Sequence, residues 1–460
     1  MTLPITPQAE EYCWEQYFQR LGCRSFVSTK PGMLLEGVKC QYTLPELAQD
    51  CGVIIIPCSE SAFVRLLHKP VQDLNCISIL DVFPSNYPSN RFFQYSYSIP
   101  VLFWGEGYED GSKPFAERRE DGTVVFYADI IAAAFFMLTR WEETVSPVRD
   151  QHGRFPATAS VAYRQGFLDR PIIDEYALIL QAWLKTLLPG WDPNPPRFSV
   201  KLSHDIDFVR TASLRRVGGD LIRRRNPARA VQTFRQWVNP ALDPALQGCY
   251  ELADLSEQHG FRSAFYFMAA QRSSLDSGYD PCAKPVQQLI SDLRQRGHEA
   301  GFHPGYQTFA NPERFYQEKQ RMDAALGESR YGGRQHYLRF QVPETWRLWE
   351  EVGLAYDSTV GYADHEGFRC GTCHPFQPFD IARNRPLDLW EIPLIVMDGT
   401  LKQYRNLTPE QGEERILILA QRCKAVNGTF TLLWHNTSLY DDWEPWGHMY
   451  QRILPKLAQP

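Results

Sequence analysis

The chain lacks the features that mark several specialised classes of protein. None of its apolar runs reaches the roughly 18 uninterrupted residues that a membrane-spanning helix needs. Its N-terminal stretch, MTLPITPQAEEYCWEQYF, has neither a positively charged start nor an apolar core, so we expect no secretory signal peptide. It also contains no internal repeat and no low-complexity tract. We therefore expect a soluble globular protein of the cytoplasm.

An excess of positive charge is also missing. The 48 Lys and Arg residues are outnumbered by 54 Asp and Glu residues, which gives a net charge of −6. This balance argues against a protein that binds nucleic acid through a globally basic surface. The 11 cysteines are odd in number and scattered through a long chain, so they do not indicate a disulfide framework. We expect no nucleic-acid partner, and cysteines that remain free thiols.

The sequence does have enough apolar material for an ordinary globular core. Of its 460 residues, 43% are hydrophobic and 22% are charged. At about 100–200 residues per domain, this length predicts two or three domains. Aromatic residues make up 13% of the chain. Aromatic rings bind sugars but also fill cores, and composition alone does not choose between these uses.

A proline-rich segment, Trp191–Pro196 (WDPNPP), is the clearest domain boundary. The part before it mixes short apolar runs, which predict strands, with longer segments of helical periodicity. The strands are expected at Val53–Pro57 and Ile99–Trp104, and the helices at Asp129–Trp141 and Ile172–Leu188. We therefore expect a mixed α/β domain over residues 1–195.

After the boundary, short strands alternate with helical stretches. The strands are expected at Phe198–Leu202, Ser263–Met268, Glu299–Phe302 and Phe430–Trp434. Alternation of this kind indicates parallel β/α units, in which chemistry gathers at the C-terminal ends of the strands. Residues 196–460 are therefore expected to form the second domain and to hold the functional site.

One segment, residues 209–235, differs from the rest of the chain in charge. It carries eight arginines and one acid, Asp220, so its local charge of +7 leaves −13 for the remainder. An amphipathic basic surface favours a peripheral contact with anionic lipid, or with a lipid-linked phosphate, at the inner face of a membrane. A solvated helical insertion over 209–240 explains the pattern equally well. The apolar residues among the arginines are Val217, Leu221, Ile222, Val231, Phe234 and Trp237.

Four short motifs contain residues suited to catalysis. Asp205 and Asp207 follow a predicted strand, and two carboxylates at a strand end can face one pocket, one as a metal ligand and one as a base. His303 ends another predicted strand and suits metal binding through a neutral imidazole. Arg334 and His435 lie in later segments. Each motif alone also fits a structural role, such as a helix cap, a surface cation or a buried core histidine.

In their order and spacing, these motifs resemble the polysaccharide deacetylase superfamily, whose members are metal-dependent amidohydrolases that remove N-acetyl groups from sugars. The resemblance covers about 260 residues. It implies an α/β fold in which a distorted (β/α)7 barrel follows a smaller mixed α/β domain. The matching blocks are Ser203–Asp207, Gly297–His303, Arg334–Tyr337 and Leu432–His435.

The resemblance also implies catalytic roles for particular residues. Asp205 would be the general base that activates water, and Arg334 would orient its carboxylate through charge-assisted hydrogen bonds. The backbone around Tyr337 would help to hold the oxyanion. His435 would protonate the leaving amine.

The metal site implied by the resemblance is one ligand short. Asp207 and His303 match two ligands, but the position of the second metal histidine, four residues after the first, holds Gln307. A catalytic zinc ion usually has three protein ligands. The nearest replacements are His336, inside the Arg-x-x-Tyr loop, and His204, beside the aspartate pair. We expect a variant site that binds a divalent metal ion, with Zn²⁺ as the first candidate and His336 as the third ligand.

The whole chain further resembles a bacterial subgroup in which an uncharacterised α/β domain precedes the catalytic one. The resemblance implies a hydrolase that deacetylates an amino sugar in a surface polysaccharide or in its lipid-linked precursor. Two alternatives remain open: a catalytically inactive relative that only binds glycan, for which Gln307 argues, and an amidase of the same fold acting on a non-sugar amide. The matching stretches are Asp129–Glu143, Gly153–Pro156, Arg170–Tyr176, Tyr356–Thr359, Gly367–Pro375 and Glu391–Asp398.

The segment Cys370-Gly-Thr-Cys373-His374 fits the pattern for attachment of a c-type haem. Haem attachment requires export, for which the sequence shows no signal, and a zinc ribbon would need a second cysteine pair. The glycine, threonine and proline residues around this motif instead favour a loop on the substrate side of the second domain.

Overall fold

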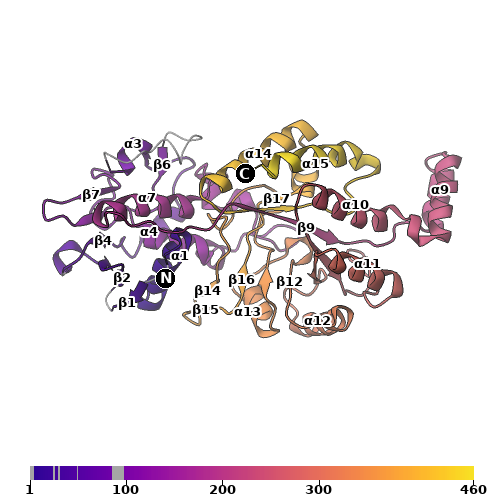
Figure 1. The fold of residues 1–460 in the computed structure, drawn as a ribbon, viewed down its shortest axis with the longest axis horizontal. Coiled ribbons are helices and arrows are strands. Elements are labelled where there is room, and N and C mark those ends of the chain that lie inside the picture. The colour runs from indigo at the N-terminus through magenta and orange to yellow at the C-terminus, as the bar shows by residue number, and fades with distance from the viewer. Residues whose placement is uncertain (1–4, 24–25, 30–31, 49, 85–97, 460) are drawn as a thin grey trace.

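A computed structural model of the chain describes residues 5–23, 26–29, 32–48, 50–84 and 98–459. Figure 1 shows two α/β units side by side, the first built from the N-terminal part of the chain and the second from the remainder. The main sheet of the first unit lies within residues 26–126, and that of the second within residues 199–433. Within the described ranges, no helix combines the length and the apolar character needed to cross a bilayer.

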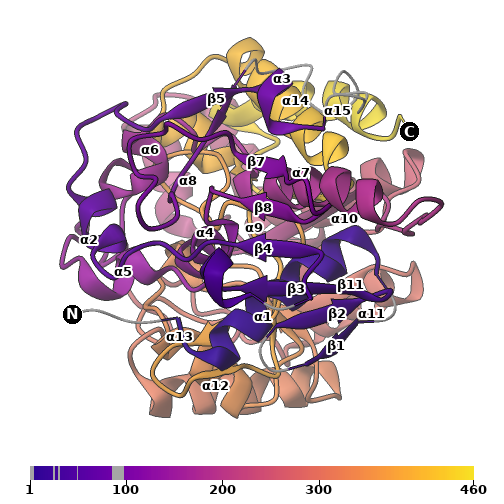
Figure 2. The same cartoon turned by 90° about the vertical axis from the view of Figure 1, so that its left-hand side faces the viewer.

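The N-terminal unit contains a six-stranded mixed sheet, which faces the viewer in Figure 2. Helices α1 (Pro7–Leu21), α4 (Ile130–Leu138) and α7 (Ile172–Leu187) contact one another beside it. All nine residues of α4 are buried, so this helix is the centre of the core of the unit. The strand order is β1 (Phe26–Ser28), β2 (Met33–Leu35), β3 (Val38–Tyr42), β4 (Val53–Ile55), β8 (Val124–Phe126) and β7 (Ala116–Arg118).

The helix predicted at Asp129–Trp141 is broken into two. Asp129 caps α4 by accepting a hydrogen bond from the Ala132 N–H, but the helix ends before Arg140, whose φ is +53°. A second short helix, α5 (Trp141–Val145), follows the break. The strand predicted at Ile99–Trp104 is also shorter than expected, because β6 covers only Ser98–Pro100.

The second unit is built on an open, curled sheet of eight strands that are all paired in parallel. The described residues contain no pair between the two edge strands, β16 and β17, so the sheet does not close. The seven-stranded barrel therefore stays a prediction. The strand order is β16 (Trp390–Glu391), β13 (Tyr356–Asp357), β12 (Gly332–Gly333), β11 (Glu299–His303), β10 (Ala264–Met268), β9 (Ser199–Ile206), β18 (Thr429–Leu433) and β17 (Val396–Met397).

The register of these strands brings the motif residues to one edge. Asp205 pairs with Tyr266 across β9 and β10, and Met268 pairs with His303 across β10 and β11. Leu433, two residues before His435, pairs with Ser203. Helices surround the sheet: α10 (Pro244–Gln258), α11 (Lys284–Gln295), α12 (Pro312–Leu326), α13 (Glu344–Glu351), α14 (Pro409–Ala425) and α15 (Glu444–Leu457).

A buried ion network joins the two units. Glu143, which follows the break at Arg140, accepts hydrogen bonds from Arg140 Nε at 2.8 Å and from Arg369 Nε at 2.9 Å. Arg140 also donates to the hydroxyl of Tyr362. All three charged side chains are at most 3% exposed. Contacts with Arg369 and Tyr362, far away in the sequence, therefore explain why the chain bends where local periodicity predicted one continuous helix.

Candidate active site

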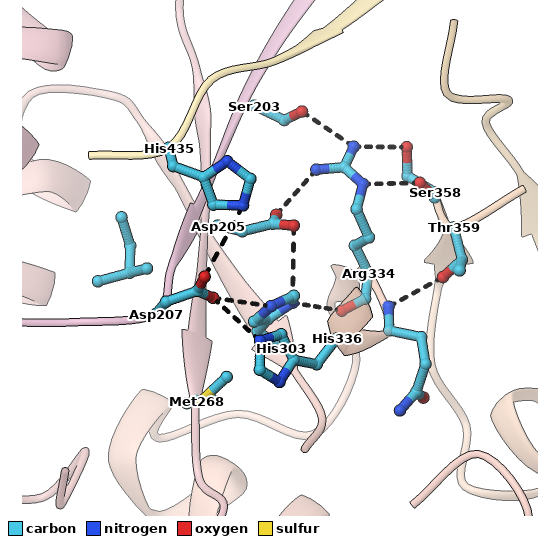
Figure 3. Close-up of polar contacts among 12 residues, drawn as sticks. Ser203, Asp205, Asp207, Met268, His303, Arg334, His336, Ser358, Thr359 and His435 are labelled. Carbon is cyan, nitrogen blue, oxygen red and sulfur yellow. Dashed lines mark hydrogen bonds and ion pairs between the residues drawn. The ribbon is translucent and has the colours of Figure 1, made fainter. Parts of the chain in front are cut away.

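The aspartate pair lies at the C-terminal end of β9, and the two side chains have different partners (Figure 3). Oδ1 of Asp205 accepts a hydrogen bond of 2.9 Å from Nη1 of Arg334. The Arg334 guanidinium is fully buried and also donates to the Ser358 carbonyl and to the Ser203 hydroxyl. Because these bonds fix the guanidinium, Arg334 holds the Asp205 carboxylate in one orientation and keeps a positive charge beside it.

Asp207 lies beside two histidines from neighbouring strands. Its Oδ1 is 3.2 Å from Nε2 of His303, which ends β11, and 3.6 Å from Nε2 of His336, in the loop after β12. Potential ligand atoms of these three side chains all lie within 4.8 Å of one another. The structure thus brings together two of the ligands expected from the motifs and the histidine expected to replace the missing one.

In the rings of His303 and His336, Nδ1 already has a hydrogen-bond partner. Nδ1 of His303 lies 2.6 Å from the carbonyl oxygen of Arg334, and Nδ1 of His336 lies 2.9 Å from a carboxylate oxygen of Asp276. Both acceptors lack a proton, so each Nδ1 must donate, and in a neutral ring the lone pair is then on Nε2. Both Nε2 lone pairs therefore face Asp207, in the arrangement in which a second hydrogen bond orients a metal-binding imidazole.

The electrostatic environment between Asp207, His303 and His336 favours a cation. His303 Nε2 and Asp207 Oδ1 are buried without a hydrogen-bond partner among the described residues. Burial opposes ionisation of Asp207, but His336, His303 and His435 hold its pKa below its usual range. Burial also lowers the pKa of His303, yet the two neighbouring carboxylates raise it overall. Two imidazoles and a carboxylate, with Nε2 of His303 and Oδ1 of Asp207 buried and unsatisfied, form a donor set that fits a zinc-like cation.

The other residues considered as ligands lie elsewhere. His204 is fully buried on the opposite face of β9, where its Nδ1 bonds the Trp434 carbonyl and burial lowers its pKa to about 3. Gln307 is exposed and lines a separate hollow beside α12. The expectation that His204 could complete the cluster is therefore wrong, whereas His336 has the required position.

His435 pairs with Asp398, a residue that the sequence motifs missed. Nδ1 of His435 is 2.7 Å from Oδ1 of Asp398, and its Nε2 is 3.8 Å from Asp207. Burial alone would lower the pKa of His435, but Asp398 and the other carboxylates raise it to about 10. Asp398 directly follows β17, as Asp207 follows β9, and this position at the end of an apolar run is the signal that could have identified it.

These groups open into one cavity of about 270 Å³. Asp205, Asp207, His303, His336 and His435 all line it. Its remaining wall combines polar and apolar side chains and includes three aromatic residues: Tyr337, which has a positive φ of 61°, Tyr404 and Trp443.

Among the described residues of the N-terminal unit, Arg154 lines this cavity. Arg154 lies between α5 and the turn at Ala157–Ala159, and its side chain reaches the second unit. It donates to the Tyr337 carbonyl at 2.9 Å and to the Tyr404 hydroxyl at 3.1 Å, while Asp150 accepts from its Nε at 2.7 Å. No chemical signal in the sequence marked Arg154, which appeared only within the Gly153–Pro156 stretch.

The Cys-x-x-Cys-His motif is in the core and not at the cavity. Cys370, Cys373 and His374 are at most 5% exposed and pack against α7 of the N-terminal unit. The substrate-side loop expected here is therefore wrong. Asp174, Cys373 and His374 form a second group with metal-binding atoms, but Asp174 already accepts hydrogen bonds from Arg20, Thr372 and the Cys373 N–H. This group is satisfied as a structural network.

Residues 2–189 match the model of a family of unknown function, DUF7033. No curated protein matches the chain. Among solved structures, a chain described as a provisionally assigned polysaccharide deacetylase from Mycobacterium smegmatis is 16% identical, with a TM-score of 0.39. The match covers 59% of this chain and 87% of that one. This likeness is too distant to support an argument about function.

Proposed function

We propose that the protein is a metal-dependent hydrolase that removes the N-acetyl group from an amino sugar of a surface polysaccharide or of its lipid-linked precursor. The observation that carries the proposal is the convergence of Asp207, His303 and His336, with both histidine Nδ1 atoms already bonded. These three side chains would hold a divalent cation, with zinc as the first candidate. When bound, such a cation supplies Lewis-acid activation of the amide carbonyl.

Asp205 is in position to act as the general base. Its Oδ1 bonds Arg334, and its other oxygen lies 3.8 Å from His303, at the floor of the cavity. A water molecule in the cavity would lose a proton to Asp205 as its oxygen forms a bond to the amide carbon. The hydrogen bond from buried Arg334 fixes the orientation of the carboxylate that accepts this proton.

His435 is in position to act as the general acid on the other side of the cavity. With Asp398 on Nδ1, the ring is held so that Nε2 faces the cavity. When the C–N bond breaks, the proton on Nε2 passes to the departing nitrogen, which leaves as an amine while the acyl group leaves as acetate. Base and acid are therefore separate residues, each oriented by an oppositely charged partner.

The cavity wall favours a sugar over a small aliphatic amide. Tyr337, Tyr404 and Trp443 supply aromatic faces, and the polar groups of Gln403 and Ser438 lie among them. Pyranose rings present apolar C–H faces and hydroxyl edges, which match this combination. These three aromatic side chains are the reason to prefer an amino-sugar substrate over the alternative non-sugar amide.

The second candidate function is glycan binding without catalysis. The argument for it was that Gln307 occupies the position of the second metal histidine. Because His336 lies where a third ligand is needed, Gln307 no longer implies an incomplete site. A protein that only binds glycan would also have no use for two separately oriented proton-transfer pairs.

Acetate release tests the proposal. N-acetylglucosamine oligomers are incubated with the zinc-loaded protein, the Asp205→Asn variant and the Gln307→Ala variant. We expect release by the first, a loss of at least about 10²-fold in Asp205→Asn, and full release by Gln307→Ala, which lies outside the cavity. Binding of the oligomers without release would support the glycan-binding alternative. Release that is unchanged in Asp205→Asn would contradict the proposal.

A further inference from the structure

Helices α8 (Leu214–Ile222) and α9 (Pro227–Val238) form a hairpin that projects from the end of the molecule opposite the N-terminal unit (Figure 1). We call residues 213–238 the basic hairpin. The helices are joined by buried Asp220, which accepts hydrogen bonds from Thr233 at 2.7 Å and from Arg224 at 2.9 Å. Ser213 caps α8 and Asn226 caps α9. The basic hairpin is therefore a formed element whose outer surface has a definite arrangement.

Apolar side chains of the basic hairpin face outward. Val231, Phe234 and Val238 of α9 are spaced three and four residues apart, so they lie on one face of the helix, and they are 46–61% exposed. Leu221 and Ile222 of α8 are 50% and 77% exposed. Several exposed apolar side chains on one projecting element are typical of an interaction surface.

The arginines of the basic hairpin divide into two groups. Arg216 and Arg229 form ion pairs with Asp441, and Arg224 forms one with Asp220. The other group has no ion-pair partner in the part of the chain that the structure describes, and its members are exposed. A hollow of about 360 Å³ beside α8 is lined by arginines of both groups and has only Asp220 as an acid. The exposed group consists of Arg215, Arg223, Arg225 and Arg235.

The base of the basic hairpin is connected to the mouth of the cavity. Asp441, which pairs with Arg216 at 3.0 Å and with Arg229 at 2.8 Å, begins the turn Asp441–Trp443. Trp443 lines the cavity. The hairpin also follows Asp207 after a connection of only five residues, 208–212, which leaves the strand end where the site lies. A surface bound by the hairpin would therefore lie near the cavity entrance.

We propose that the basic hairpin docks the protein on an anionic phospholipid membrane. The exposed apolar side chains would enter the boundary between headgroups and acyl chains, while the four exposed arginines bind lipid phosphates. An acidic protein or a nucleic acid would match the arginines but would leave the outward Phe234 and Ile222 in water. Docking itself does not depend on the proposed reaction. If both proposals hold, the cavity receives a substrate whose lipid anchor lies in the same membrane.

Vesicle sedimentation tests the docking. The full-length protein is mixed with vesicles of phosphatidylcholine alone or of phosphatidylcholine with phosphatidylglycerol, and the pelleted fraction is measured. We expect pelleting with the mixed vesicles only. We also expect most of it to disappear at about 1 M salt, where the screening length is about 3 Å. Equal pelleting with both vesicles, or none with either, would overturn the proposal.

Two variants of the basic hairpin test whether it forms the lipid-binding surface. The first changes Arg215, Arg223, Arg225 and Arg235 to Glu, and its control makes the same change at exposed Arg197, Arg262, Arg314 and Arg330. The second is Leu221→Asp with Phe234→Asp, and its control is Leu47→Asp with Val71→Asp.

We expect at least about a tenfold loss of vesicle binding in each hairpin variant and none in the controls. Equal losses in variant and control would show that the effect is not specific to the hairpin and would overturn the proposal. The proposal would also be overturned if the parent protein did not bind vesicles but self-associated, as detected by light scattering, and if this self-association disappeared in the hairpin variants.

Discussion

Nδ1 of His435 lies 2.7 Å from Oδ1 of Asp398, and the second oxygen of this carboxylate accepts the backbone N–H of His435 at 2.9 Å. The same carboxylate therefore fixes both the ring and the backbone from which it projects. Asp398 is fully buried, so its charge acts on the ring with little screening by water. This pair determines the orientation and the charge state of the proposed general acid.

Replacing Asp398 with Asn should impair catalysis more than binding. The variant keeps a similar shape but removes the charge that favours the protonated ring, so we expect kcat for acetate release to fall about 10²-fold or more. KM should change little, because Asp398 does not need to contact the sugar. The matched control, Asp442→Asn, changes an exposed aspartate near the cavity rim. A normal kcat in Asp398→Asn would contradict the role given to this pair.

Metal affinity should depend on His336 and on Asp276, but not on Gln307. We expect His336→Gln to lose tight Zn²⁺ binding, since it removes one of three ligands. Asp276→Asn should weaken binding by about 10–100-fold, because it loosens the hydrogen bond that orients the ring. Isothermal titration with Zn²⁺ and metal analysis of the purified variants measure both effects. Gln307→Ala serves as the control, and a loss of affinity there would show that the ligand set is different.

The N-terminal unit should be needed for catalysis through Arg154. Its bonds to the Tyr337 carbonyl and the Tyr404 hydroxyl hold two walls of the cavity. Because small displacements of positioned groups cost up to about 10²-fold in rate, we expect kcat/KM to fall about 10–100-fold in Arg154→Ala. Arg154→Lys should recover little, since lysine lacks the planar fork that serves several acceptors at once. Exposed Gln151, in the same loop, provides the control, and equal losses in Gln151→Ala would indicate a general effect on the loop.

We expect acidic pH to weaken the contact between the two units, because it protonates Glu143. Burial opposes its ionisation, but Arg369 and Arg140 lower its pKa from 4.5 to about 2. A pKa depressed by folding contributes stability above the unfolded-state value, and this contribution is lost as the pH falls from about 4.5 to about 2. The shift corresponds to about 3 kcal/mol.

Urea unfolding of the parent and of Glu143→Gln checks this expectation. At neutral pH the variant should be less stable by about 3–5 kcal/mol, because it leaves a buried guanidinium poorly paired. The difference should shrink towards pH 2. Glu351→Gln, which breaks an exposed pair with Arg383, should cost less than about 1 kcal/mol at any pH. A difference between parent and Glu143→Gln that does not vary with pH would contradict the linkage.

The longer strands and helices could be predicted because their apolar residues repeat over several positions. The runs at Val53–Pro57, Ser263–Met268 and Phe430–Trp434 correspond to β4, β10 and β18 within two residues at each end. The strands β12, β13, β16 and β17 have two residues each, too few for any periodicity. β12 and β17 each pair with a five-residue strand, β11 and β18, whereas β13 and β16 pair only with other two-residue strands, so all four depend on hydrogen bonds from segments far away in the sequence. Whether the edge strands β16 and β17 pair and close the sheet likewise depends on segments far apart in the sequence.

By itself, the sequence determined the residue types of the site and their order along the chain, since Asp205, Asp207, His303 and His435 lie at or just after the ends of apolar strands whose pattern is local. It also determined that residues 209–235 carry concentrated positive charge. Only the tertiary structure decided which histidine joins Asp207 and His303. His336 and His204 were both candidates in the sequence, with His336 preferred as the third ligand, and the geometry excludes His204 because alternate residues of a strand face opposite sides of a sheet. His204 therefore points into the core between Phe265 and Tyr450, whereas the loop after β12 carries His336 to the cavity, where Asp276 orients its ring.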